Sequence, residues 1–136
     1  MTQAAIGAVH HIAVMVRDID QSLPFYVDRL KLVLLSDERL PQVGARLAFL
    51  DAGNTLLQLV QPTHPGPLRD DLDRYGEGLH HVCFEVPDIE AAVKRLAPGA
   101  DVTIAWGGRG LTAFLPPGAN GMRTELLQVT GNDGGS

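Results

Sequence analysis

The chain contains the same eleven-residue motif twice, and this internal repeat limits the folds that it can adopt. Residues 10–20 read HHIAVMVRDID and residues 80–90 read HHVCFEVPDIE, with identical or nearly equivalent residues at seven of the eleven positions. A chain built from two copies of one unit can place equivalent side chains on two sides of a shared cleft. The repeated side chain is a histidine, which binds metals and transfers protons near neutral pH.

Size and composition indicate a small globular protein. A length of 136 residues suits one compact domain, or two small modules that share a core. The net charge of −5 gives no support for binding to nucleic acid or anionic membranes. The single cysteine, Cys83, permits no internal disulfide, and no apolar run approaches the roughly 20 residues of a membrane span. The N-terminal residues also lack the pattern of a signal peptide, so we expect a soluble, cytoplasmic protein without nucleic-acid or membrane partners.

Each copy of the motif predicts a strand followed by a helix. Side chains alternate with a period of two over residues 11–16 and 81–86, which is typical of a strand. Asp18 and Asp88 follow as helix N-caps, and apolar residues then recur at helical spacing. Pro24 is compatible with the first helix because it falls in or near the first turn.

Three further strands are expected after each helix. They comprise residues 32–35, 46–50 and 55–60 in the first copy, and residues 101–106, 111–115 and 123–129 in the second. A tight turn at Gly53-Asn54 joins two of them. The sequence therefore predicts two βαβββ modules, residues 8–62 and 79–130, in a single domain of residues 1–136. Residues 63–78 would join the modules, with helical turns at 68–75, and residues 131–136 would form a flexible tail.

An isolated βαβββ module leaves one sheet face exposed, and two modules can cover such faces together. The expected fold class is α+β, with two tandem βαβββ modules forming a curved, half-open mixed sheet with helices outside. The concave face then remains available for a ligand.

Strand alternation selects one histidine of each pair as a candidate metal ligand. If the apolar side chains of the first strand lie under the helix, His11 points into the concave face, and His81 does so in the second copy. The last strand of each module carries one polar residue within an apolar run, Gln58 and Glu125. Two nitrogen and two oxygen donors suit a divalent ion such as Co²⁺, Ni²⁺, Zn²⁺ or Mn²⁺, with positions left for water or substrate.

Each of these residues also has a simpler explanation when taken alone. A histidine at a strand start is often structural, Gln58 can satisfy a loop backbone group, and Glu125 can pair with Arg123 or Arg46. Their equivalent placement in two copies favours a site. His10 and His80 face the other way from their neighbours and His64 lies in the polar connection. We therefore expect packing roles for His10 and His80 and a solvated side chain for His64.

The two modules with these four residues resemble the vicinal oxygen chelate (glyoxalase/bleomycin resistance/dioxygenase) superfamily. The segments GLHHVCFEV (78–86) and LQLVQP (57–62) resemble methylmalonyl-CoA epimerases in particular, and the resemblance covers about residues 8–130. It implies that His11, Gln58, His81 and Glu125 are ligands of a divalent metal ion. Co²⁺ is the favoured ion, with Ni²⁺, Mn²⁺ or Zn²⁺ as alternatives. It also implies an acyl-CoA substrate and a homodimer.

The reaction that this resemblance implies is an isomerisation. A metal-dependent epimerase would interconvert the C2 epimers of methylmalonyl-CoA, or of a related acyl-CoA, by proton abstraction and a metal-stabilised enolate. Glu125 could transfer a proton while also contacting the metal. The resembling epimerases often place a glutamate on the strand after a Pro-x-x-Gly turn, but here residues 41–47 (PQVGARL) offer Arg46 or Leu47. Glu85, on the same strand face as His81, is the fallback for the second catalytic group.

Three alternative functions share this scaffold. A glyoxalase I-type (lactoylglutathione lyase-like) isomerase would use the same metal chemistry, although Gln58 in place of a carboxylate argues against it. An iron-dependent dioxygenase would use His11, His81 and Glu125 as a two-His, one-carboxylate site, although the chain is short for that class. A non-catalytic small-molecule-binding resistance protein often lacks the ligands, and this chain has all four.

Overall fold

The computed structural model describes residues 6–129 of the chain. These residues form two compact units. The His11 unit consists of residues 11–80, and the His81 unit consists of residues 6–10 together with residues 81–129. The boundaries pass through the His-His pairs, so the two histidines of each pair belong to different units.

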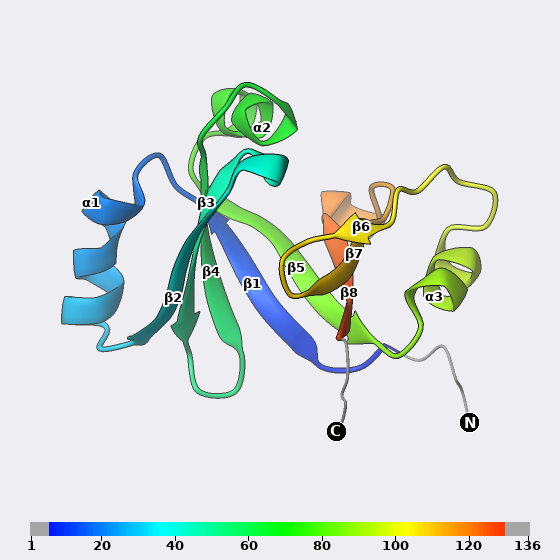
Figure 1. Cartoon of the computed structure of the whole chain (residues 1–136), viewed down its shortest axis with the longest axis horizontal. Coiled ribbons are helices and arrows are strands. Elements are labelled where there is room, and N and C mark those ends of the chain that lie inside the picture. The colour runs from blue at the N-terminus through cyan, green and yellow to red at the C-terminus, as the bar shows by residue number, and fades with distance from the viewer. Residues whose placement is uncertain (1–5, 130–136) are drawn as a thin grey trace. The chain divides into compact units, whose positions relative to one another are not determined.

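The His11 unit contains a mixed four-stranded sheet in the order β2-β3-β4-β1 (Figure 1). The pairs β2–β3 and β3–β4 are antiparallel, whereas β1 and β4 are parallel. The elements are β1 (Val9–Met15), α1 (Ile19–Leu23), the π-helical segment η1 (Pro24–Arg29), β2 (Val33–Leu40), the 3-10 turn η2 (Pro41–Val43), β3 (Ala45–Asp51), β4 (Leu56–Pro62) and α2 (Pro67–Tyr75).

The helix predicted after Asp18 forms, but it changes type at Pro24. Asp18 caps α1, since its carboxylate accepts the backbone N–H of Asp20 at 2.9 Å. Pro24 has no N–H to donate to the carbonyl four residues earlier. The residues after it adopt the wider π form, in which the Leu30 N–H donates to the Phe25 carbonyl at 2.9 Å. A local change of helix type therefore accommodates the proline.

The sheet of the His11 unit buries apolar side chains on both faces. On one face, called the α1 face, Val14 and Val16 pack with residues of α1 and η1. On the other, called the site face, Ala13 and Met15 pack with residues of α2. Because side chains alternate along β1, His11 lies on the site face, as the sequence predicts.

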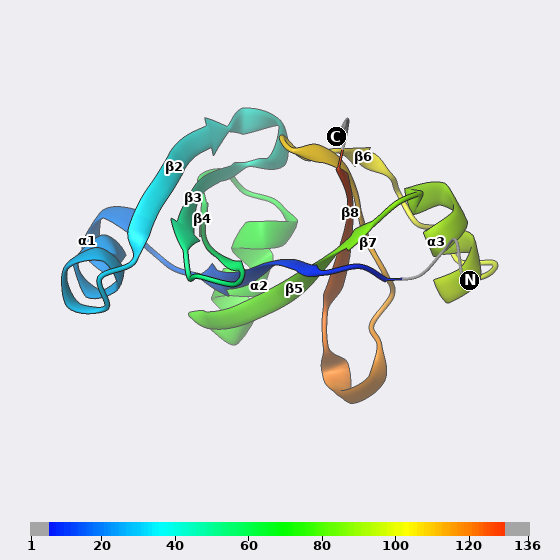
Figure 2. The same ribbon diagram turned by 90° about the horizontal axis from the view of Figure 1, so that it is seen from below.

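The strands of the His81 unit have the order β5-β8-β7-β6, and the elements of this unit are also labelled in Figure 2. The pair β5–β8 is parallel, and β7 is antiparallel to both β8 and β6. The elements are β5 (Gly78–Val86), α3 (Ile89–Leu96), β6 (Ala105–Trp106), β7 (Gly110–Phe114), the 3-10 turn η3 (Ala119–Gly121) and β8 (Thr124–Val129). α3 covers one sheet face, where Val86, Ala113 and Leu126 are buried with its apolar side chains. The opposite face, which carries His81, is the site face of this unit.

Each unit contains an equivalent hydrogen bond at the start of its helix, which extends the repeat beyond the sequence motif. The backbone N–H of Ile19 donates to Gln61 Oε1 at 2.9 Å, and that of Ile89 donates to Gln128 Oε1, also at 2.9 Å. Each glutamine lies three residues after an oxygen donor predicted for the site. The first strand, the hydrogen bond at the helix start and the last strand of the module therefore recur together in both units.

Two predicted strands differ from those observed. The strand predicted at 32–35 is only the start of β2, which continues to Leu40 because its polar half pairs with β3. The strand predicted at 101–106 is reduced to Ala105–Trp106. Its alternating residues Val102 and Ile104 do not join a ladder but pack on the core beneath α3. Apolar alternation there reflects burial rather than strand pairing.

The remaining expectations hold where the structure describes the chain. The α+β fold class and one βαβββ module in each unit are confirmed. The turn at Gly53-Asn54 joins β3 to β4, and α2 occupies the predicted connection. The predicted tail, residues 131–136, lies outside the described residues. Over residues 6–129, no helix is long and apolar enough to cross a membrane.

Candidate metal and acid–base site

In the His81 unit, the predicted ligands His81 and Glu125 meet directly. His81 Nε2 lies 3.0 Å from Glu125 Oε1, and both atoms are shielded from solvent. The pairing of β5 with β8 positions them, because Glu125 is the register partner of Cys83, two residues after His81 on the same face. The first and last strands of the module therefore bring one imidazole and one carboxylate together.

An aromatic side chain on the next strand fixes the His81 ring. Phe114 on β7 is the register partner of Glu125. Its ring meets the His81 ring edge-on, with centroids 4.9 Å apart and an interplanar angle of 87°. Such edge contacts between rings restrict orientation in addition to burying apolar area. The imidazole is therefore held from two neighbouring strands.

The His11 unit repeats this arrangement with an amide in place of the carboxylate. Gln58 on β4 is the register partner of Ala13, two residues after His11, and also of Phe49 on β3. His11 and Gln58 are buried, with 4% and 6% of their surface exposed, and His11 Nε2 is shielded from solvent. The Phe49 ring meets the His11 ring edge-on, with centroids 5.4 Å apart and an interplanar angle of 78°.

Sequence reasoning missed the two phenylalanines. Phe49 precedes Gln58 by nine residues and Phe114 precedes Glu125 by eleven. This similar spacing, across one hairpin in each copy, is a signal that could have identified them as partners of the ligands. Their equivalent contacts in both units show that the duplication includes the support of each imidazole.

The donor atoms fit a divalent metal ion. Two ligand atoms bound to one ion at about 2.1 Å and at right angles lie about 3.0 Å apart, which matches the distance between His81 Nε2 and Glu125 Oε1. Imidazole nitrogen with carboxylate or amide oxygen is a donor set that Co²⁺, Ni²⁺, Zn²⁺ and Mn²⁺ accept. Each unit supplies one nitrogen and one oxygen from equivalent strand positions.

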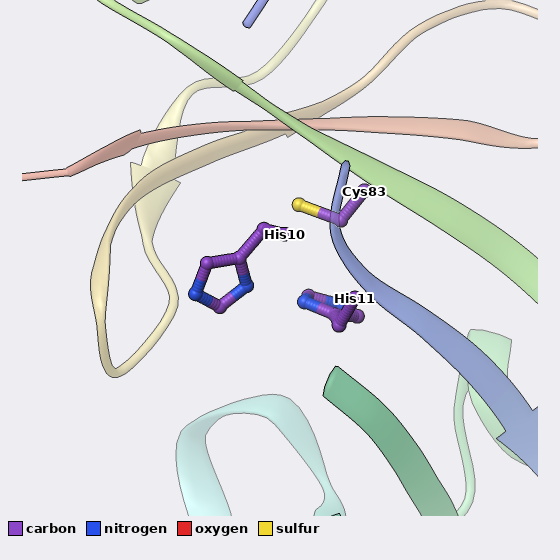
Figure 3. A group of neighbouring side chains, drawn as sticks. All are labelled: His10, His11 and Cys83. Carbon is purple, nitrogen blue, oxygen red and sulfur yellow. The ribbon is translucent and has the colours of Figure 1, made fainter. Parts of the chain in front are cut away.

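Cys83 lies on the site face of β5 but is not suited to act as a thiolate. Its side chain is fully buried, and burial raises the pKa of the thiol, with further increases from the negative charge of Glu125 and a hydrogen bond to it. A thiol in this setting stays protonated and unreactive. Figure 3 shows Cys83 on β5 with His10 of β1, and the sulfur lies within 4.8 Å of a ring nitrogen of His10. His10 thus approaches the site face of the His81 unit and does not point away from it.

Glu85, the fallback catalytic residue, lies on the same face as His81 and Glu125. It is half-buried, and its register partner on β8 is Leu127. Its backbone N–H donates to the Ala8 carbonyl at 2.9 Å, and its carbonyl accepts the Gly7 N–H at 2.8 Å. The strand position of Glu85 is therefore fixed from the N-terminal side as well.

The other polar residues considered have structural contacts. His80 Nε2 lies 2.9 Å from Asp71 Oδ2 of α2, which agrees with a packing role, and His64 lies in the connection beside Thr63. Arg46 points to the α1 face, where it donates to Asp37 and Asp20. It therefore pairs with these two carboxylates.

The Arg46 contacts also explain why the arginine does not act as an acid–base group. Its hydrogen bonds to Asp37 and Asp20 raise the pKa of the guanidinium further above its usual value and lower the pKa of both carboxyl groups. All three groups stay charged at neutral pH. Leu47, the next residue, faces the site and carries no ionisable group.

Comparison with known proteins identifies the family. The family model of the Glyoxalase/Bleomycin resistance protein/Dioxygenase superfamily matches residues 10–128. The mitochondrial methylmalonyl-CoA epimerase of Mus musculus is 31% identical over 132 residues, which cover 91% of this chain and 74% of that protein. The ethylmalonyl-CoA/methylmalonyl-CoA epimerase of Cereibacter sphaeroides is 29% identical over 133 residues, which cover 91% of this chain and 99% of that protein.

The same relationship is seen among solved structures. Methylmalonyl-CoA epimerase in complex with methylmalonyl-CoA and NH₄⁺ superposes with a TM-score of 0.82 at 27% identity, covering 93% of this chain and 96% of that one. Both comparisons extend over the two copies of the motif. The chain therefore belongs to the glyoxalase/bleomycin resistance protein/dioxygenase superfamily, and within it resembles the methylmalonyl-CoA epimerases.

Proposed function

We propose that this protein is an isomerase that interconverts the C2 epimers of methylmalonyl-CoA or of a related acyl-CoA. The observation that carries the proposal is the buried His81–Glu125 pair, with an Nε2–Oε1 distance of 3.0 Å. The same strand register recurs for His11 and Gln58. This arrangement occurs in a chain whose relatives are named as methylmalonyl-CoA epimerases, one of them solved with methylmalonyl-CoA.

The proposal includes one divalent metal ion held by His11, Gln58, His81 and Glu125 together. Co²⁺ is the preferred ion. Ni²⁺, Mn²⁺ or Zn²⁺ are alternatives, because they also bind imidazole nitrogen and oxygen donors. Only one of the four ligands is anionic, so a divalent ion keeps net positive charge to attract an acidic substrate. When bound, the ion would stabilise negative charge on the thioester oxygen as the C2 proton leaves.

The carboxylates of the His81 unit would move the proton. Glu125 has two carboxylate oxygens, so one can lie against His81 while the other accepts the C2 proton. Glu85 lies further along the same strand face and would assist as an acid or base. Cys83, the register partner of Glu125, is fully buried and limits the access of water there, which strengthens charge interactions.

We propose that the chain acts as a single domain, residues 1–136, made of modules 8–62 and 79–130 joined by residues 63–78. The match of one family model to residues 10–128 supports this organisation. We also propose a cytoplasmic homodimer. The exposure of Leu30, Val33 and Leu35, each at half or more of its surface, supports an association of chains. The free, buried Cys83 agrees with a reducing compartment.

Deuterium exchange tests the proposed function. Metal-free and Co²⁺-loaded protein would each be incubated with (2S)- or (2R)-methylmalonyl-CoA in D₂O, with the C2 proton and the epimer ratio followed by NMR. We expect exchange and epimerisation only with the loaded protein. A fully loaded protein that exchanges neither epimer would overturn the proposal. His64→Ala, which changes a histidine in the exposed connection, is the control for general effects of histidine loss.

A further inference from the structure

Epimerisation requires a proton-transfer group on each side of C2. Glu125 and Glu85 both lie on one face of one sheet, in the His81 unit. Both belong to one unit, so a carboxylate on the site face of the His11 unit is a separate candidate for the second group. The inference below rests on the proposed function and concerns the second group.

The site face of the His11 unit carries two carboxylates among its strand residues. Glu38 on β2 is the register partner of Leu47 on β3, which in turn pairs with Val60. Asp51 is the last residue of β3, and its Oδ1 accepts the Gly53 N–H at 2.8 Å, so it shapes the turn to β4. Glu38 is therefore the carboxylate that lies within the sheet and not at a turn.

The sheet face on which the exposed Glu38 lies follows from its neighbour. Asp37 accepts hydrogen bonds from Arg46 at 2.9 Å and 2.8 Å, and Arg46 also donates to Asp20 of α1 at 2.8 Å. These contacts hold Asp37 on the α1 face. Because side chains alternate along a strand, Glu38 lies on the site face with Gln58 and His11.

Glu38 lies on the same sheet face as the proposed ligand Gln58 but is not adjacent to it. In a flat sheet, two strands and two residues separate the Cα atoms of Glu38 and Gln58, which corresponds to about 12 Å. Both side chains extend from the same face, and Leu47 on β3, the register partner of Glu38, has no ionisable group. A carboxylate here can reach a substrate that is held at Gln58 without being a ligand itself.

We propose that Glu38 is the second proton-transfer residue of the epimerase. In one direction its carboxylate takes the C2 proton, the C–H electron pair moves toward the thioester carbonyl, and an acid of the His81 unit protonates the opposite face of C2. In the other direction Glu38, now protonated, gives its proton to C2. β2, which pairs with β3 at Leu47, thus supplies a carboxylate that the side chain of Leu47 does not have.

Stereospecific exchange in D₂O tests this role. Each pure epimer would be incubated with Co²⁺-loaded Glu38→Gln protein, and loss of the C2 proton would be recorded separately from epimer formation. We expect epimerisation to fall by about 100-fold or more, while one epimer still exchanges its C2 proton with retention. Asp51→Asn, on the same face, keeps its turn hydrogen bond and should leave both rates unchanged. Leu47→Glu in the E38Q background should restore epimerisation from the paired position.

The outcomes separate this inference from the proposed function. Epimerisation by E38Q at the wild-type rate would overturn the role of Glu38 and leave the epimerase intact. Equal loss of exchange for both epimers in folded, metal-loaded E38Q would also overturn it, since that points to a structural effect. A wild-type protein that exchanges neither epimer would overturn the proposed function and this inference together.

Discussion

His81 Nε2 lies 3.0 Å from Glu125 Oε1, and the two residues come from the first and last strands of one module. The geometry of this pair follows from the β5–β8 register, its ring orientation from Phe114, and its counterpart in the His11 unit differs by one functional group. Of Gln58 and Glu125, only Glu125 has an ionisable group that can take up or release a proton.

Replacing Glu125 by glutamine makes the two modules equivalent in their oxygen donors. E125Q removes the anionic ligand and the proposed base while keeping the side-chain shape. We expect C2 exchange to fall by about 100-fold or more, and metal to bind about 10- to 100-fold more weakly, with no loss of fold. Metal content and exchange in D₂O measure both. Gln58→Glu is the matched control: it should retain the metal, and loss of the metal in Q58E would argue against Gln58 as a ligand.

Removal of either helix contact should cost similar stability. Gln61→Ala and Gln128→Ala each delete the acceptor of a buried helix N–H, from Ile19 or Ile89. We expect each to lower the free energy of unfolding by about 1–3 kcal/mol, as measured by urea denaturation. If the two variants lose markedly different amounts of unfolding free energy, the two hydrogen bonds do not have the same structural role.

The Asp37–Arg46 contact predicts a defined pH dependence. The Arg46 hydrogen bond lowers the pKa of Asp37 in the folded protein. Stability from this group is therefore present above the unfolded pKa of about 3.9 and is lost as the pH falls through the lower, folded value. Because Asp37 is exposed and its ion pair is screened by solvent, wild type should exceed Asp37→Asn in unfolding free energy by only about 0.5–1 kcal/mol at neutral pH, and the gap should shrink below about pH 4. Urea denaturation as a function of pH measures it, and a gap that widens in acid would contradict the assignment.

Gly110 is required by a close backbone approach. A Cβ atom at Gly110 would clash with the backbone carbonyl oxygen of Gln128, so Gly110→Ala must shift β7 against β8. We expect a loss of about 1–3 kcal/mol in unfolding free energy. At Gly118 the nearest such contact is 3.8 Å, and Gly118→Ala should change stability by no more than about 0.5 kcal/mol. Thermal or urea unfolding of the pair distinguishes a steric effect from a general effect of replacing glycine.

The repeated motif allowed much of the fold to be predicted. Alternation in β1 and β5, with caps at Asp18 and Asp88, sufficed for both strand–helix units and for the faces on which His11 and His81 lie. Prediction failed where a residue's partner is distant in sequence. The polar half of β2 became a strand through its pairing with β3, and Val102 alternates because it packs under α3.

The same distinction between local sequence pattern and distant strand pairing applies to the candidate site. Its proposed ligands are polar residues within apolar strands and are visible from the sequence. Phe49 and Phe114 were missed because their roles depend on register with Gln58 and Glu125. The proposed role of Glu38 also depends on strand pairing, because its face follows from the register of β2 with β3.

The claim that most needs testing is that histidines from both copies of the motif bind one ion. Calorimetric titration of metal-free protein with Co²⁺ tests it directly, with the wild type compared to His11→Ala, His81→Ala and the control His64→Ala. The account predicts one ion per chain in the wild type and in H64A, and loss of that binding in both H11A and H81A. Wild-type affinity that persists in either H11A or H81A would contradict it.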